Sequence, residues 1–192
     1  MGQGLRAVLV AGSTTLALAV APSLGSSARD PLPEYSVKAA FLYHFVEFVE
    51  WPRTSPRPPA TVIIGVLGRD PFGDVLDKAI LEKVVAGHSL AIRRFASVER
   101  LEPCDILFIS SSEMPHLPEI LARLKAGPVL TVGEADRFAR RGGMIGFFFE
   151  DNRVRLEINR AAAEKAGLRL SSKLLAVARL VKPDVADSDG GR

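Results

Sequence analysis

The sequence predicts an α/β protein: a single domain with a mostly parallel mixed sheet flanked by helices, and a C-terminal antiparallel hairpin followed by two helices. Three observations support this fold class. Short apolar runs such as residues 61–67 alternate with segments that have helical spacing. Two strand-like runs, residues 144–150 and 153–159, flank an Asp-Asn turn. Apolar residues make up 47% of the 192 residues, enough for one core.

The first 28 residues have the layout of a secretory signal peptide. Arg6 is their one charge, and an apolar segment, residues 7–21, is followed by small residues up to Ala28. We therefore expect export and cleavage after Ala28. The alternative is an uncleaved membrane anchor, but the segment contains Gly12 and falls short of the roughly 20 apolar residues of a membrane span.

The domain, residues 29–182, is expected to begin with an amphipathic helix over residues 33–51. An apolar arc covers half of its circumference and comprises Val37, Phe41, Leu42, Phe45, Val46, Phe48 and Val49. Trp51 and Pro52 end this helix. A proline-rich connector, residues 53–60, then leads to the first strand.

Strands and helices alternate through the middle of the chain. Strands are predicted over residues 61–67, 90–95, 104–110 and 129–132. A helix with Asp70 as its N-cap and Pro71 at its first position follows the first strand, and its expected buried side is Leu76, Ile80 and Leu81. A second helix carries Leu117, Ile120, Leu121 and Leu124 on one face, and residues 134–140 form a short helical crossing. This alternation predicts parallel strands covered on both sides.

The C-terminal hairpin has two different strands. Residues 153–159 alternate strictly, so one face is buried and the other exposed. Residues 144–150 do not alternate, so both faces of that strand need cover. Helices are expected over residues 160–166 and 171–181, and the second has an apolar stripe of Leu174, Leu175, Ala178 and Val181. The polar, glycine-rich tail, residues 183–192, is predicted to be disordered.

The sequence contains no catalytic, cofactor or metal-binding motif. His44, His88 and His116 stand singly, without the spacing of metal ligands. Twenty-five basic and 22 acidic residues give a net charge of +3 without a basic stripe, which argues against nucleic-acid binding. Cys104 is the sole cysteine, so an intramolecular disulfide is excluded. We expect a buried, unreactive thiol, with intermolecular pairing or redox sensing as the alternative.

A small-ligand pocket is one hypothesis for the strand ends near Gly68, Ser110 and Ser111. The glycines at Gly65 and Gly68 do not have the spacing of a dinucleotide-binding loop. A hydrolase nucleophile at Ser110 or Ser111 lacks the G-x-S-x-G turn, and helix capping explains these serines adequately.

Phe147, Phe148 and Phe149 cannot all face one core layer, because successive side chains of a strand point to opposite sides. If the hairpin lies at the edge of the sheet, part of this cluster is exposed and offers a docking surface. The alternative is that the last helix or the first one covers both sides.

Several segments, taken in order, resemble the YfiR-like family of exported bacterial proteins. The resemblance runs over nearly the whole mature chain. It is carried by the segments at residues 37–43, Phe45, Phe48, Trp51 and Pro52, residues 66–68, 70–73, 106–110, 142–145, 158–159, 166–168 and 171–175.

The resemblance implies regulation without catalysis. Proteins similar to YfiR are periplasmic α/β proteins that tend to dimerise and restrain an inner-membrane diguanylate cyclase, which lowers cyclic-di-GMP and biofilm formation. A YfiB-like outer-membrane lipoprotein relieves the restraint. YfiR-type relatives carry paired cysteines, whereas this chain has Cys104 alone, so redox control through an intramolecular disulfide is absent. The family also includes sensor modules, so a sensor kinase is another expected partner.

We therefore expect a non-enzymatic regulator that acts by binding, without a cofactor. The predicted partner-binding residues are Trp51, Phe147, Phe148, Phe149, Arg153 and Arg155. The alternative function is a periplasmic small-ligand receptor that uses Gly68, Ser110 and Ser111.

Overall fold

The computed structural model describes residues 31–52, 61–125 and 127–184. The expected signal peptide, the connector at residues 53–60 and most of the expected tail lie outside the described residues. The elements are α1 (Pro31–Phe48), β1 (Val49–Glu50), β2 (Thr61–Leu67), α2 (Asp74–Ile80), β3 (Val84–Val85), β4 (His88–Phe95), η1 (Val98–Arg100), β5 (Ile106–Ile109), η2 (Ser111–His116), α3 (Leu117–Leu124), β6 (Leu130–Gly133), β7 (Ile145–Glu150), β8 (Arg153–Ile158), α4 (Arg160–Lys165), β9 (Arg169–Leu170), α5 (Ser172–Ala176) and β10 (Arg179–Leu180).

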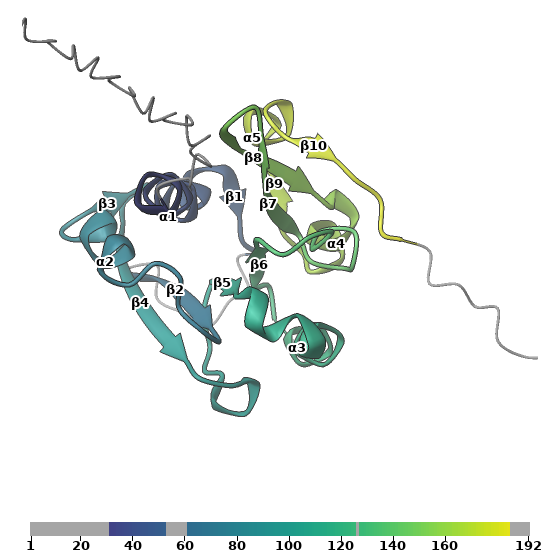
Figure 1. Ribbon diagram of the computed structural model, residues 1–192, viewed down its shortest axis with the longest axis horizontal. Helices are drawn as coiled ribbons and strands as arrows, with labels where there is room; N and C mark the ends of the chain where they lie inside the picture. The colour runs from purple at the N-terminus through teal and green to yellow at the C-terminus, as the bar shows by residue number, and fades with distance from the viewer. Residues whose placement is uncertain (1–30, 53–60, 126, 185–192) are drawn as a thin grey trace, which may run out of the picture.

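A mixed sheet of eight strands forms the centre of the molecule, in the order β10-β8-β7-β6-β5-β2-β4-β3. The strands β4, β2, β5, β6 and β7 run parallel, and the hairpin partner β8 is antiparallel to β7. Helices lie on both faces, with α1 and α2 on one side and α3 on the other (Figure 1). The predicted α/β fold with a mostly parallel mixed sheet is therefore confirmed.

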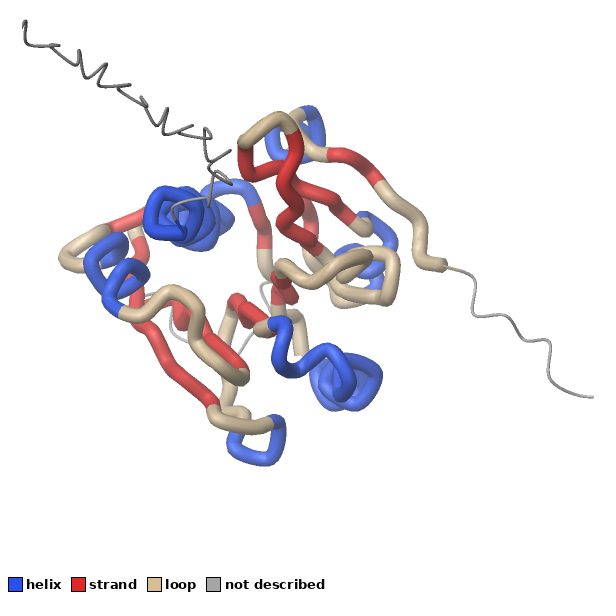
Figure 2. Tube along the Cα trace, viewed as in Figure 1, coloured by secondary structure: helices blue, strands red, loops and turns tan. Residues whose placement is uncertain are grey.

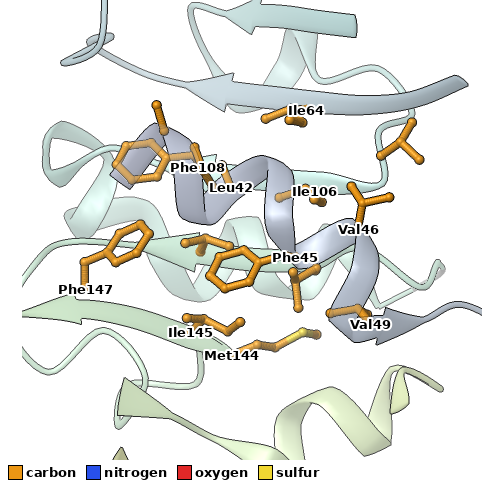
Figure 3. Packing of buried hydrophobic residues seen from close by; sticks show 14 of the residues in the cluster. Leu42, Phe45, Val46, Val49, Ile64, Ile106, Phe108, Met144, Ile145 and Phe147 are labelled. Atoms are coloured by element: carbon orange, nitrogen blue, oxygen red, sulfur yellow. The ribbon is translucent and has the colours of Figure 1, made fainter. Parts of the chain in front are cut away.

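The central strands are buried on both faces, as their continuous apolar sequences predict. Ile106 and Phe108 of β5 join the core cluster under α1, whereas Leu107 and Ile109 of the same strand join the cluster under α3. In Figure 3, side chains of α1 such as Leu42 and Phe45 face this sheet. The first helix therefore contributes much of one core, as the sequence indicates.

Several predicted boundaries were wrong. The first helix ends at Phe48, because the next two residues form β1, which pairs with β9. The helix α2 begins at Asp74 instead of Pro71, and Asp70 accepts hydrogen bonds from the backbone N–H of Phe72 and from Nε of Arg94, both at 2.7 Å. Leu81 lies beyond α2 and is 71% exposed.

The segment between β6 and β7, residues 134–144, contains no helix and runs as a series of turns (Figure 2). Phe138 explains the difference, since its side chain is 1% exposed and fills the space beside Gly133 and Gly143. A Cβ atom on either glycine would overlap the ring. The crossing therefore combines turn hydrogen bonds, such as that from the N–H of Arg141 to the carbonyl of Arg137 at 2.8 Å, with one aromatic ring packed against two glycines.

The end of the chain also differs from the prediction. The helix α5 stops at Ala176, and Arg179–Leu180 forms β10 parallel to β8. Asp184 is held by a hydrogen bond from its N–H to the carbonyl of Arg140 and by an ion pair with Arg137. The ordered chain thus reaches two residues past the expected domain boundary.

Both outer strands of the large sheet are two residues long. β3 pairs with His88 and Ser89 of β4, and β10 pairs with Glu157 and Ile158 of β8. The remaining outer side of β4 carries the exposed residues Arg93 and Arg94, which form ion pairs with nearby carboxylates. Charged residues and short strands are common protections of a sheet edge.

Candidate functional site

The β7–β8 hairpin has the turn and register that the sequence predicts. Asp151 and Asn152 have positive φ angles of 50° and 58°, the conformation of a two-residue hairpin turn. Phe148 lies opposite Arg155, and Glu150 lies opposite Arg153. Because side chains alternate along both strands, these four residues share the face turned away from α1.

Phe147 points to the opposite face and belongs to the core. Its side chain is 3% exposed, and its ring centroid lies 5.9 Å from that of Phe41 and 6.3 Å from that of Phe45 (Figure 3). Phe149 has the same parity and is half-buried opposite Val154. The prediction that all three phenylalanines contribute to a surface patch was therefore wrong for Phe147, which α1 covers.

The outward side of the hairpin combines one aromatic ring with charged groups. We name it the hairpin face and define it as Phe148, Glu150, Arg153, Arg155, Glu157 and Arg179 of β10. The guanidinium carbon of Arg179 lies 4.4 Å from the ring centroid of Phe148, a cation–π contact. Arg179 also donates a hydrogen bond of 2.6 Å to Glu150 and lies 3.7 Å from Glu157. The side chain of Arg179 therefore covers part of the Phe148 ring.

Arg155 has an unusual environment for a charged side chain. It is half-buried, and its Nε atom is fully buried without a hydrogen-bond partner among the described residues. Arg153, at the tip of the same strand, is exposed. A buried guanidinium N–H without an acceptor is unfavourable. The strand β8 thus carries one exposed arginine, Arg153, and one arginine, Arg155, whose Nε atom is enclosed by the protein.

Trp51 belongs to a different part of the molecule from the hairpin face. It follows β1, whose pairing partner is β9 instead of β7 or β8. The indole is half-buried against the larger core cluster, and its Nε1 atom is buried without a described hydrogen-bond partner. The strand pairing therefore does not bring Trp51 to Phe148.

Two exposed apolar residues next to the hairpin were missed by sequence reasoning. Val177 is 68% exposed and Leu180 is 55% exposed, on the segment that connects α5 to β10 and within β10 itself. The sequence had placed both within a helix that continued to Val181. The end of the helix at Ala176 had one signal in the sequence, the valines and the arginine in residues 177–181. This signal is weak because the segment is so short.

The three residues of the predicted ligand pocket do lie together. Gly68 follows β2 and Ser110 follows β5, where the order of the parallel strands reverses, and the N–H of Ser110 donates to the carbonyl of Leu67 at 3.0 Å. The space beside Gly68 is occupied by the side chains of Ser112 and Glu113. Ser110 is 5% exposed and its Oγ caps η2. The capping interpretation of this serine is confirmed.

Ser111 is exposed at the start of η2. Within the described ranges, no group of three or more His, Cys, Asp and Glu side chains is placed to hold a metal ion. Cys104 is 5% exposed, in agreement with the expected buried thiol.

A buried ionic cluster at the start of α1 was not predicted. Lys38 is 5% exposed, and its Nζ lies 2.6 Å from Glu134, which follows β6, and forms a second ion pair with Glu34. Burial, and next the negative charge of Glu134, raise the pKa of Tyr35 to about 12. The sequence did contain a signal for this cluster. Lys38 lies three residues before Phe41 and four before Leu42, so helical spacing puts its side chain on the apolar, buried side of the helix.

None of the described helices is both long enough and apolar enough to cross a lipid bilayer. A family model described as YfiR/HmsC-like matches residues 35–179, which include the hairpin and most of α1. The chain belongs to the YfiR/HmsC-like family. Membership implies a periplasmic regulator of cyclic-di-GMP signalling, and the family is regulatory and non-catalytic.

Solved structures support the fold of this YfiR/HmsC-like chain. A conserved domain protein from Vibrio cholerae is 13% identical with a TM-score of 0.55, and the match covers 77% of this chain and 60% of that one. An ABC domain in complex with L-Trp from Streptococcus pneumonia is 11% identical with a TM-score of 0.51, covering 74% and 60%. The chain thus spans 60% of each. No curated protein matches it.

Proposed function

We propose that this chain is a non-enzymatic periplasmic regulator that binds the periplasmic region of an inner-membrane diguanylate cyclase or a related sensor kinase. Binding restrains the partner and lowers cyclic-di-GMP output. The proposal is supported by the family match over residues 35–179. A regulator of this kind has to bind one state of its target more tightly than another, because only differential affinity shifts a conformational equilibrium.

The hairpin face is the proposed binding surface. The observation that carries this placement is the half-buried ring of Phe148, which lies against the guanidinium group of Arg179 at a position opposite Arg155 in the strand pairing. Aromatic and arginine side chains are the residues most enriched among those that dominate binding energy at protein interfaces. Arg153 is exposed on the same face and supplies a guanidinium donor for a carboxylate or carbonyl of the partner.

The test is capture of a tagged periplasmic region of a diguanylate cyclase from the same cells. Phe148→Asp is expected to lower capture about tenfold or more, since a charge then replaces an apolar anchor. Leu81→Asp is the matched control, because Leu81 is 71% exposed at the β3 end of the sheet.

Arg153→Glu provides a second variant at a fully exposed position, and its melting temperature should match that of the unchanged chain. Loss of capture in this variant and in Phe148→Asp, but not in Leu81→Asp, supports the surface. Equal capture by all three variants would contradict it. We then expect the other predicted residues, Trp51, Phe149 and the buried Phe147, to stabilise the packing of α1 and the hairpin without contacting the partner.

Three further features belong to this proposal. The N-terminal 28 residues direct export, which N-terminal sequencing of the periplasmic protein tests. The chain forms a homodimer, which light scattering measures.

A YfiB-like outer-membrane lipoprotein relieves the restraint by competing for the hairpin face. Adding the soluble domain of this lipoprotein should therefore release captured cyclase. The Phe148→Asp variant should not bind the lipoprotein domain.

A small-ligand receptor function is the second candidate, favoured by the convergence of Gly68, Ser110 and Ser111 at the switch point of the sheet. Ser112 and Glu113 fill the adjoining space, so a ligand has to displace them. A thermal-shift screen with amino acids tests this function, since a ligand of the native state raises the melting temperature. Loss of the shift in Ser111→Ala would assign it to these residues.

A further inference from the structure

A cavity of about 370 Å³ opens between the ends of α3 and α4, away from both the hairpin face and Gly68. Its volume falls in the range of roughly 300–1,000 Å³ that is typical of small-molecule sites. The walls come from four segments of the chain. They include Leu121 and Leu124 of α3, Val129 before β6, Met144 before β7, and Ala162 of α4.

The interior of this cavity is apolar. Thr131 is the hydroxyl-bearing residue of the lining, and it is 1% exposed with its Oγ1 already accepting a hydrogen bond of 3.0 Å from the N–H of Met144. The walls thus present hydrocarbon to an occupant. A ligand that fits needs an apolar body, since a polar group in this space would lose its bonds to water without replacement.

The lining carries positive charge and no carboxylate. Lys125 and Lys165 both line the cavity, both are exposed, and neither forms an ion pair with a described residue. The helix ends beside them are capped. The carbonyl of Leu124 accepts from the N–H of Gly127 at 3.1 Å, and that of Ala162 accepts from the N–H of Ala166 at 3.2 Å. The two ammonium groups are therefore the uncompensated charges at this site.

We propose that this cavity is a binding site for an aliphatic carboxylate, with the hydrocarbon chain between α3 and α4 and the carboxylate between the ammonium groups of Lys125 and Lys165. Lysine side chains are long and flexible enough to keep their charged ends at the mouth while their stems line the wall. Charge complementarity selects the anion, and the apolar walls select the chain. This site is independent of the proposed partner-binding surface.

Calorimetry on the purified protein tests the ligand class, with decanoate as the probe below its micelle concentration. Decanoate is expected to bind, and octanoate to bind about 15-fold more weakly, because each of the two missing methylenes contributes about fourfold in affinity when buried. Decanol should bind more weakly than decanoate, and decylamine should not bind. Equal binding of decanoate and decanol, or binding only above the micelle concentration, would overturn the proposal.

Two kinds of variant locate the site. Replacing both lysines, Lys125→Ala with Lys165→Ala, should weaken decanoate binding about tenfold or more and leave decanol binding unchanged. Lys173→Ala, an exposed lysine on α5, is the matched control and should bind decanoate normally. Ala162→Phe should fill the cavity and abolish binding of both probes.

The lysine variants change exposed side chains, so they are expected to fold even if Ala162→Phe does not. Decanoate binding that is unchanged in the double lysine variant contradicts the assignment of the head group. Capture of the cyclase region by the same variant should be normal, which separates this result from a failure of the hairpin face.

Discussion

Lys38 is a charged residue on the apolar side of α1. It forms ion pairs with two carboxylates, one close to it in the sequence and one distant. Glu34 lies one turn earlier on the same helix, whereas Glu134 directly follows β6, 96 residues later in the chain. The side chains of Lys38 and Glu134 are 6% and 12% exposed. Such a pair adds little net stability when intact, but removing one partner leaves a buried charge uncompensated.

We predict that Lys38→Met lowers the free energy of unfolding by about 3 kcal/mol, because Glu134 then keeps its charge in a buried site. Urea denaturation measures this change. Combining Lys38→Met with Glu134→Gln should recover most of the loss. The control Lys173→Met, at an exposed position, should change stability by less than about 0.5 kcal/mol. A Lys38→Met variant as stable as the control would show that the ion pair is solvated.

Tyr35 gives a second prediction, for alkaline pH. Its folded-state pKa of about 12 lies above the ordinary value of 10.0, so the folded state holds the phenolic proton more tightly than the unfolded state does. This contribution to stability is complete below pH 10 and is lost as the pH rises toward 12. Tyr35→Phe should therefore remove part of the fall in melting temperature between pH 10 and 12. Identical pH profiles would contradict the assignment.

The crossing between β6 and β7 shows how one side chain determines an element. Phe138 occupies space that exists because Gly133 and Gly143 have no Cβ atom. We predict that Gly143→Ala destabilises the protein by about 1–3 kcal/mol, the usual cost of overpacking a core. Gly127→Ala, where nothing lies within 4 Å of an added Cβ, is the control and should be neutral. Thermal unfolding compares the two variants.

The elements that could be predicted from sequence are those with a periodic signal. The strand β2 was predicted to the residue, because a strand buried on both faces is apolar throughout. The hairpin was predicted because Asp151 and Asn152 tolerate positive φ. The two-residue strands β1, β3, β9 and β10 are too short for any periodicity, and they depend on neighbours brought close by the fold.

The candidate site was predictable to a similar degree. Strand parity placed Phe148 and Phe147 on opposite faces of the sheet. It could not show that α1 covers Phe147 and that Arg179 lies against Phe148. Arg179 was hidden because the last helix was expected to continue past it. The cavity between α3 and α4 had no sequence signal at all, because its walls meet only after four segments fold together.

The whole molecule depends on α1, which contacts several parts of the sheet. Tyr35 meets Phe72 after β2 in an edge-on contact of 5.4 Å, Lys38 reaches Glu134, and Phe45 stacks on Phe147 of β7. We predict that Phe45→Ala, at a position that is 0% exposed, costs about 3–5 kcal/mol, the range for large core truncations. Unfolding should remain a single transition by circular dichroism. Two separate transitions would contradict one cooperative core.

The short outer strands β3 and β10 have a consequence for behaviour in a crowded compartment. A long bare strand would template another chain of the same kind and lead toward fibres. Here Arg93 and Arg94 lie on the part of β4 that β3 leaves uncovered, and both are exposed and ion-paired with carboxylates of the same chain, so a second copy that paired along this side would meet charged side chains. These short and charged edges of the sheet therefore disfavour strand-by-strand addition of further copies.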